Sequence, residues 1–183
     1  MESYTYLLVE HQIIRTERLI LRPITLADAK GMYEYASDDE NTRFVFDTHP
    51  TIEITRQKIA EYFVADPVGK YGIEIAETGK FIGSIDIRID PMNKSGCIGY
   101  VLNKDYWGNG FMVEAGRAIL DVAFQTLQLE RVYSVHDVRN PASGKVMQRL
   151  GMTYEGTLRK SRFVKNEFVD DAYYAILKEE YRR

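Results

Sequence analysis

The stretch YWGNGFMVEAG, from Tyr106 to Gly116, holds two glycines separated by one residue, directly before an amphipathic run. Glycine at positions 108 and 110 lets a ligand approach the backbone where a Cβ would otherwise stand in the way. The first backbone N–H groups of a helix have no partner within the helix and lie at the positive end of its dipole. A glycine loop that leads into such a helix is therefore a candidate site for a phosphate or pyrophosphate.

Two nucleotide-binding motifs fail on spacing. A Rossmann fingerprint needs a third glycine three residues after Gly110, where this chain has Val113. A Walker loop needs Gly-Lys followed by Ser or Thr, which the sequence lacks. NAD and ATP are thereby excluded as expected ligands of the loop. The alternative to an anion site is a plain strand-to-helix turn that uses glycine for a positive φ.

Length and composition narrow the class of protein. The chain has 183 residues, and we expect a single domain over residues 1–183. A hydrophobic fraction of 45%, with 28% charged residues, is typical of a soluble globular protein. The net charge of -3 argues against a nucleic-acid partner. No apolar run approaches a membrane span and no signal peptide opens the chain, so we expect no membrane partner and a cytoplasmic location.

Cysteine and histidine usage gives two further expectations. The single cysteine, Cys97, excludes a disulfide within the chain and fits a reducing compartment. The three histidines lie far apart in sequence, with no metal-ligand spacing, so we expect no metal.

The hydrophobic pattern predicts the elements that position the loop. Residues 19–38 read as a strand, a turn capped by Thr25 and a short helix, and residues 52–63 as a second helix. A hairpin over 70–90 turns at residues 78–80, and its second arm alternates apolar and charged residues. A strand over 97–103 precedes an amphipathic helix from Met112 to Leu127. The residues Tyr4, Tyr6, Leu7 and Leu8 are interpreted as an extra strand or a dimer contact.

The last third of the chain adds a strand, a helix and a hairpin. The strand covers residues 131–138. The helix begins with Asn140 as N-cap and Pro141 at its first position, and Gly151 follows its end. The hairpin covers 159–177 and turns near Lys165 and Asn166. This order predicts an α+β fold, with a mixed sheet and helices on both faces.

Three segments also carry motifs in a characteristic order. IGYVLNKDYWGNGFMVEA holds a Gly-Tyr strand, a Trp-Gly-x-Gly loop and a Glu-Ala helix start. VRNPASGKVMQRLGMTYEGTLR holds an Asn-x-x-Ser helix start, a Leu-Gly turn and a Glu-Gly-x-Leu-Arg strand, and IIRTERLILRPITLADA holds an opening strand. As an ordered set they resemble the GCN5-related N-acetyltransferases (the GNAT superfamily), especially its RimJ/RimL branch.

The resemblance implies a mostly antiparallel sheet that splays open between its fourth and fifth strands, here residues 98–103 and 131–137. It implies acetyl-CoA as cosubstrate, held in the splay. Val101 and Leu102 are expected to pair with the pantetheine arm, Asn140 to reach it from the other side, and Lys145 to lie near the phosphates. The residues expected to hold the pyrophosphate are Gly108, Asn109, Gly110, Phe111 and Met112.

The implied reaction is attack of an amine on the thioester of acetyl-CoA. Holding the amine against the carbonyl supplies much of the rate, and a backbone N–H of the splayed strand is a candidate to stabilise the oxyanion. Two proton transfers remain. Ser143, the serine of the Asn-x-x-Ser motif, is the candidate acid for the leaving thiolate. Its alternative role is hydrogen bonding at the helix start.

The base is not evident, because Cys97 occupies the strand position where many relatives carry glutamate. His136 and Asp137 are candidates, with an exposed strand end as the alternative, and Glu155 is expected to orient a turn. An α-amine, with a pKa of about 7.7–8.0 against about 10.4 for lysine, needs least help.

We therefore expect a protein N-terminus of the ribosomal-protein type as the amine acceptor. A small amine (a polyamine, an amino acid or an antibiotic) and a non-catalytic acyl-CoA-binding module remain alternatives. The resemblance also allows a homodimer.

Overall fold

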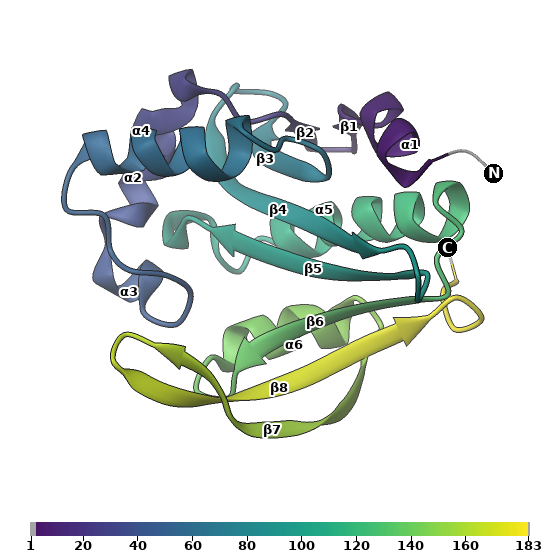
Figure 1. The fold of residues 1–183 in the computed structure, drawn as a ribbon. Helices are drawn as coiled ribbons and strands as arrows, with labels where there is room; N and C mark the ends of the chain where they lie inside the picture. Colours follow the sequence, from purple (N-terminus) through teal and green to yellow (C-terminus); the bar gives the residue numbers. More distant parts are fainter. Residues whose placement is uncertain (1–2, 183) are drawn as a thin grey trace.

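The computed structural model describes residues 3–182, which form one eight-stranded sheet in the order β1-β2-β3-β4-β5-β6-β8-β7 (Figure 1). Every neighbouring pair of strands is antiparallel except β5 and β6, which are parallel. The strands are β1 (Ile14–Arg15), β2 (Leu19–Arg22), β3 (Lys70–Ile75), β4 (Phe81–Asp90), β5 (Ser95–Leu102), β6 (Arg131–Asp137), β7 (Thr153–Val164) and β8 (Glu167–Leu177).

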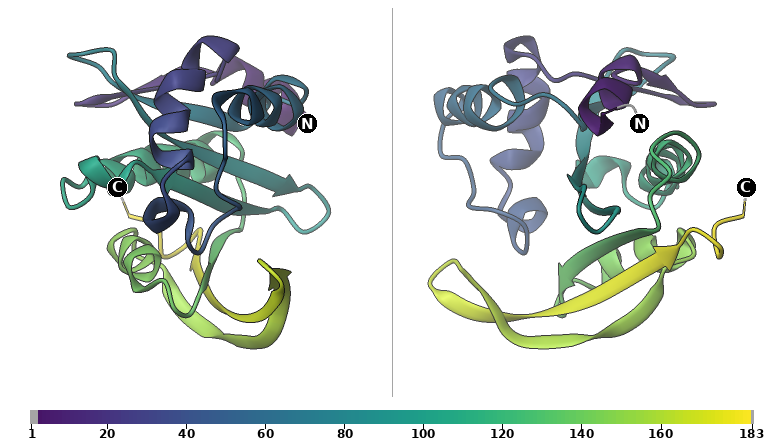
Figure 2. Two further views of the ribbon diagram at one scale, coloured as in Figure 1. Left: turned by 90° about the vertical axis from the view of Figure 1, so that its left-hand side faces the viewer. Right: turned by 45° about the vertical axis from the view of Figure 1, so that its right-hand side comes forward.

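Helices cover both faces of the sheet, as the sequence predicts (Figure 2). On one face lie α2 and α4, and on the other α5 and α6. The α-helices are α1 (Tyr4–Glu10), α2 (Ala29–Ala36), α3 (Asp39–Thr42), α4 (Ile52–Lys58), α5 (Phe111–Asp121) and α6 (Pro141–Arg149). Short π-helical segments, Ile59–Val64 and Val122–Thr126, prolong α4 and α5.

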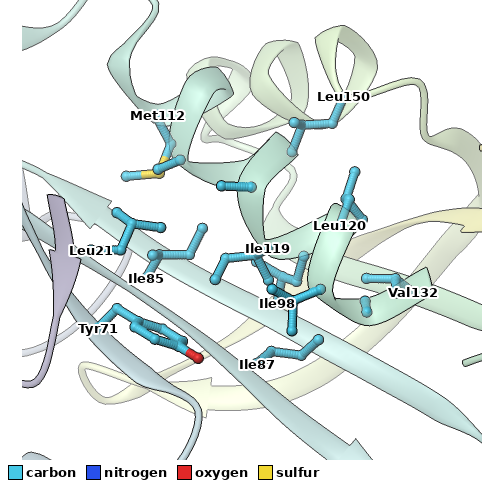
Figure 3. Packing of buried hydrophobic residues seen from close by; sticks show 14 of the residues in the cluster. Leu21, Tyr71, Ile85, Ile87, Ile98, Met112, Ile119, Leu120, Val132 and Leu150 are labelled. Carbon is cyan, nitrogen blue, oxygen red and sulfur yellow. The ribbon is translucent and has the colours of Figure 1, made fainter. Parts of the chain in front are cut away.

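The larger core lies between the sheet and the pair α5 and α6. The alternation in β4 buries Ile85 and Ile87 there, while Asp86 and Arg88 point to the opposite face. The apolar stripe of α5 faces these strand residues, with Ile119 at its centre (Figure 3). A smaller cluster under α2 and α4 covers the other face near β4 and the end of β5.

The sheet splays where β5 and β6 stop pairing. Their register runs from Ser95 opposite Arg131 to Ile98 opposite Ser134, and the Ser134 hydroxyl donates to the Ile98 carbonyl at 2.8 Å. Beyond this pair the last four residues of β5 have no partner on β6, and the two strands diverge (Figure 1). The predicted splay is therefore present.

The turns lie at the residues that the sequence predicts, and their residues take positive φ values. Gly79 takes a φ of +67° in the β3–β4 turn, and Gly151 one of +83° after α6. The β7–β8 hairpin turns at Lys165 and Asn166, with φ values of +49° and +62°. Positive φ at both central residues is what a two-residue hairpin turn requires.

The interpretation of the N-terminal residues as a strand is wrong, because Tyr4 to Glu10 form α1. Ser3 caps this helix by accepting a hydrogen bond from the Tyr6 N–H at 3.1 Å. Leu8 is buried, and Tyr4 packs on the same core one helical turn earlier. That spacing of four residues belongs to a helix, not a strand.

Candidate active site

The glycine loop has the predicted conformation. Gly108 and Gly110 both take a φ of +79°, and Gly110 is the N-cap of the eleven-residue helix α5. A Cβ built at Gly108 would find no heavy atom within 4 Å, so the loop surface is open there. The loop therefore presents backbone at the positive end of a helix dipole, as an anion site requires.

A salt bridge that the sequence does not reveal fixes this loop. Glu114, in the first turn of α5, accepts hydrogen bonds from the Thr16 hydroxyl at 2.6 Å and from the Arg18 backbone N–H at 2.8 Å. The Arg18 Nε donates to the same carboxylate at 2.7 Å. A further guanidinium nitrogen of Arg18 donates to the Asn109 carbonyl at 3.0 Å, and the guanidinium stacks over the Phe111 ring. Arg18 thus holds the loop against the β1–β2 turn.

A cavity of about 500 Å³ opens beside the loop and reaches into the splay. It brings together most of the predicted site residues, which lie on β5, the loop, the start of α5 and the start of α6. Asn109 is not among its lining residues, because its amide donates to the carbonyls of Tyr106 and Trp107. The predicted residues that line the cavity are Val101, Leu102, Gly108, Gly110, Phe111, Met112, Asn140, Ser143 and Lys145.

The backbone of β5 divides its hydrogen bonds between two sides. The Asn103 N–H donates to the Ile82 carbonyl of β4 at 2.8 Å. Because backbone groups alternate along an antiparallel pair, Val101 also directs its groups to β4, whereas Tyr100 and Leu102 face the splay. The Leu102 carbonyl already accepts from the Asn41 amide at 3.1 Å and the Trp107 indole at 2.8 Å.

The start of α6 forms the opposite wall of the cavity. The Asn140 Oδ1 accepts from the Ser143 N–H at 3.4 Å, which confirms Asn140 as the predicted N-cap. Its Nδ2 donates to the Ser143 Oγ at 3.0 Å. The Tyr100 hydroxyl donates to the Ser143 carbonyl at 2.9 Å, and burial raises the pKa of Tyr100 well above its usual value. The Ser143 Oγ, which accepts from Asn140, keeps its own proton for donation.

The expected alternative for His136 and Asp137, an exposed strand end, is wrong, because both are buried. The His136 Nδ1 bonds to the Asp137 carbonyl at 2.7 Å, and its Nε2 faces Gly144. Asp137 pairs with Arg139 at 2.7 Å. Packing of α6 onto the end of β6 produces this burial.

Glu155 lies on the exposed strand β7 and forms a bidentate ion pair with Arg131 of β6. Hydrogen bonds from Arg131 lower the pKa of Glu155, against a smaller opposing effect of burial. Its carboxylate is engaged in joining two strands, in keeping with the positioning role expected for it.

Basic residues surround the outer part of the cavity. Lys145 and Arg149 project from α6, and both are exposed lining residues. Arg18 approaches the loop from the other side, with a guanidinium nitrogen 3.6 Å from the position of a Cβ at Gly110. An open glycine loop, a helix N-terminus and a basic rim fit the phosphates of an elongated anionic ligand such as coenzyme A.

The fold and this site define a class of protein, and comparison with known proteins identifies it. Residues 18–153 match the family described as Acetyltransferase (GNAT) domain, and the chain belongs to that family. It is a GNAT-type N-acetyltransferase that depends on acetyl-CoA, so the alternative of a non-catalytic binding module is set aside.

Particular relatives support this assignment. The chain is 31% identical to the uncharacterized N-acetyltransferase p20 of Bacillus licheniformis, over 93% of this chain and 98% of the relative. It is 33% identical to the ribosomal-protein-serine acetyltransferase of Escherichia coli, over 55% of this chain and 57% of the relative. A GNAT acetyltransferase from Bacillus anthracis has the same fold, with a TM-score of 0.83, 28% identity, and coverage of 91% and 99% of the two chains.

Within residues 3–182, no helix is long and apolar enough to cross a membrane. The same part of the chain holds no cluster of three or more side chains suited to a metal ion.

Proposed function

We propose that this chain transfers the acetyl group of acetyl-CoA to the α-amine of a protein N-terminus. The observation that carries this choice of acceptor is Cys97, which stands on β5 just before the splay, where a glutamate base is expected by resemblance. An acceptor with a pKa of about 7.7–8.0 loses its proton more easily than a lysine at about 10.4. The relative named as a ribosomal-protein-serine acetyltransferase supports the same class of acceptor.

The cosubstrate is assigned to the splay cavity. The Tyr100 and Leu102 N–H groups face the side where a pantetheine arm would lie, and the buried Val101 side chain lines the same wall. Backbone N–H groups at the N-terminus of α5 would bind the pyrophosphate, with Lys145 near the phosphates. Acetyl-CoA supplies an activated thioester. The residues proposed for the loop contact are Gly108, Asn109, Gly110, Phe111 and Met112.

The protein contributes position and hydrogen bonds. An amine held against the thioester carbonyl reacts without the entropic cost of a bimolecular encounter. The Tyr100 N–H is the proposed donor to the oxyanion, because it faces the splay just beyond the last β5–β6 pair. The Ser143 hydroxyl, whose oxygen is held by Asn140, is the proposed acid for the thiolate.

Contacts between the end of α3 and the β7–β8 hairpin lie next to two residues of the cavity wall, Arg43 and Phe44. The Lys165 ammonium donates to the Thr42 carbonyl at 3.2 Å. Arg139 binds Glu167 at 2.8 Å and lies over the Phe44 ring. Phe44 and Arg43 line the cavity. We assign this side of the cavity to the amine acceptor.

Thiol release from acetyl-CoA tests the choice of acceptor. Three acceptors are compared at equal concentration. The first is a peptide with a free N-terminal serine, the second is an N-acetylated variant of that peptide with one internal lysine, and the third is spermidine. We expect the free N-terminus to give the highest kcat/KM. Faster reaction of spermidine would place the chain among small-amine acetyltransferases, and faster reaction of the lysine peptide would contradict the α-amine assignment.

A further inference from the structure

Asp86 lies on β4, one strand away from the splay, with its side chain on the face of the sheet opposite Ser143. Its register partner on β5 is Gly99, which directly follows the last residue of β5 that pairs with β6, Ile98. Tyr100, one position further, points to the other face and contacts Ser143. The two faces of the splay therefore carry a carboxylate on one side and a hydroxyl on the other.

The absence of a side chain at Gly99 brings this carboxylate onto the strand. A Cβ built there would lie 3.2 Å from the Asp86 Oδ2 and 3.3 Å from its Oδ1. The Arg88 guanidinium is equally near at 3.2 Å, so a side chain at residue 99 would require small shifts of both groups. Cys97, which replaces the expected glutamate, lies two register positions from the Asp86–Gly99 pair on the same face of the sheet.

The two oxygens of the carboxylate differ in their partners: Oδ2 accepts a hydrogen bond, whereas Oδ1 has only an ion pair with Arg88. Among residues 3–182, only Asp86 Oδ1 and His136 Nε2 are buried side-chain polar atoms without a hydrogen-bond partner. The Tyr62 hydroxyl donates to Oδ2 at 3.3 Å, and the Arg88 Nε lies 3.3 Å from Oδ1. An incompletely paired buried group of this kind needs an explanation, and a catalytic role is one. The side chain keeps 14% exposure, so an acceptor or a water can reach it.

The charged groups around Asp86 on this face also bind other partners. Lys70 donates to the Tyr62 carbonyl at 2.8 Å and to Asp66 at 3.0 Å. Arg88 also donates to the Cys97 sulfur at 3.3 Å. Tyr133 on β6 stands in register with Cys97. Of the described residues on this face, Asp86 is the carboxylate next to the splay.

We propose that Asp86 is the proton acceptor of the reaction and takes a proton from the acceptor ammonium, directly or through one water. The inference rests on the proposed function and deepens it. An α-amine, with a pKa of about 7.7–8.0, needs only a weak base, and Asp86 is the carboxylate assigned to that task where Cys97 replaces the expected glutamate.

The reaction removes two protons from the nitrogen of the acceptor. The ammonium gives one proton to the Asp86 carboxylate, and the freed lone pair of nitrogen forms the C–N bond at the thioester carbon. The C–S bond then breaks and its electron pair leaves on sulfur. The second proton of nitrogen is lost as the amide forms, and the thiolate takes one from Ser143, which is reprotonated by that second proton through water. Asp86 returns its proton to solvent.

The environment suits a base that works near neutral pH. Burial raises the pKa of Asp86 above its usual value, although Arg88, Tyr62 and Lys70 act in the opposite direction. A raised pKa narrows the gap to the pKa of an α-amine, which makes the proton transfer easier.

The test is Asp86→Asn, which keeps the shape of the side chain, with Asp90→Asn as the matched control on the same strand and face. Asp90 is exposed and bonds to Asn93, so its change leaves the splay untouched. We expect Asp86→Asn to lower kcat/KM at pH 7 by about 10²- to 10⁴-fold with the N-terminal serine peptide, and to leave acetyl-CoA affinity unchanged. Asp90→Asn should match the wild type.

The pH profile separates catalysis from structure. With Asp86 as base, the wild-type kcat/KM stays high below the pKa of the acceptor and falls only when Asp86 is protonated. In Asp86→Asn the fall should begin at the pKa of the amine itself, about 8. An Asn variant that keeps the wild-type profile, with less than a threefold loss of rate, would overturn the proposal.

A second variant, Tyr62→Phe, tests the same proposal if Asp86→Asn does not fold. The Tyr62 hydroxyl stabilises the ionised carboxylate, so Tyr62→Phe should move the acid limb of the wild-type profile to higher pH. An unmoved limb in a folded Tyr62→Phe would also contradict the role of Asp86. If the wild type releases no CoA with any amine, the proposed function fails and the inference falls with it. If the wild type is active and Asp86→Asn keeps its rate and pH profile, only the assignment of Asp86 as base is wrong, and the proposed function stands.

Discussion

Asn140 holds Ser143 through both atoms of its side-chain amide. Its Oδ1 accepts the backbone N–H of Ser143, which fixes the orientation of the amide, and its Nδ2 donates to the Ser143 Oγ at 3.0 Å. The serine hydroxyl is thereby positioned in the cavity with its proton free to be donated. One side chain thus serves as a helix cap and as the support of a candidate acid.

Asn140→Ala should weaken acetyl-CoA binding by about 3- to 10-fold, the equivalent of one hydrogen bond. It should also cost about 1 kcal/mol of folding stability through loss of the cap. Thr51→Ala is the control, because Thr51 caps α4 away from the cavity. Titration calorimetry with acetyl-CoA separates the two variants. Equal affinity of Asn140→Ala and wild type, with the fold intact, would remove Asn140 from the cosubstrate site.

Ser143→Ala should lower kcat by about 10²-fold and change the Kd for acetyl-CoA little, because the hydroxyl acts on the leaving thiolate and not in binding. Steady-state thiol release across the full pH range measures the effect. A kcat equal to that of the wild type at every pH would show that the serine only completes the helix start.

Gly110→Val should abolish acetyl-CoA binding. Valine at a φ of +79° costs about 1–3 kcal/mol of strain and places a branched side chain where the loop must approach the ligand. Gly79→Val is the matched control, since Gly79 has a φ of +67° in a turn with no atoms within 4 Å of its Cβ position. Both variants should lose stability, and only Gly110→Val should lose binding. Normal affinity in Gly110→Val is incompatible with a phosphate cradle at this loop.

Acid should weaken the end of β6. A hydrogen bond from Arg139 lowers the pKa of Asp137 below its usual value, against an opposing effect of burial. The pKa of Asp137 is therefore lower in the folded protein than in the unfolded chain. The contribution of its carboxylate to the free energy of unfolding is complete above the unfolded value of about 3.9 and is lost as the pH falls through the folded value. Urea unfolding should therefore find Asp137→Asn less stable than wild type at pH 7, with a difference that shrinks as the pH falls below the unfolded value of about 3.9. A difference that is constant with pH would contradict the ion pair.

Features that depend on a few neighbouring residues were predicted correctly from the sequence. The cap at Asn140, the positive φ of Gly110, the alternation in β4 and the turn at Lys165 and Asn166 each depend on a few neighbouring residues, and all are present. The convergence of the loop, β5 and α6 on one cavity followed from an ordered resemblance and not from periodicity.

Relationships across the sheet could not be read in this way. Arg18 and Glu114 are 96 positions apart, and the residues next to them in the sequence do not predict their ion pair. Asp86 and Gly99 meet only because β4 and β5 pair in one register. The hydrophobic residues of α1 are compatible with a strand in the sequence alone. The cap at Ser3 and the packing of Tyr4 and Leu8 on one core, four residues apart, show a helix.

Thermal unfolding with and without acetyl-CoA tests the central claim most directly, with NAD and ATP as control ligands. A ligand at 100 times its Kd adds about 2.7 kcal/mol of stability, which is roughly 5–10 °C in Tm for a domain of this size. We predict this shift with acetyl-CoA alone, its loss in Gly110→Val and its retention in Gly79→Val. No shift at saturating acetyl-CoA, or an equal shift with ATP, would contradict the assignment of the splay cavity to this cosubstrate.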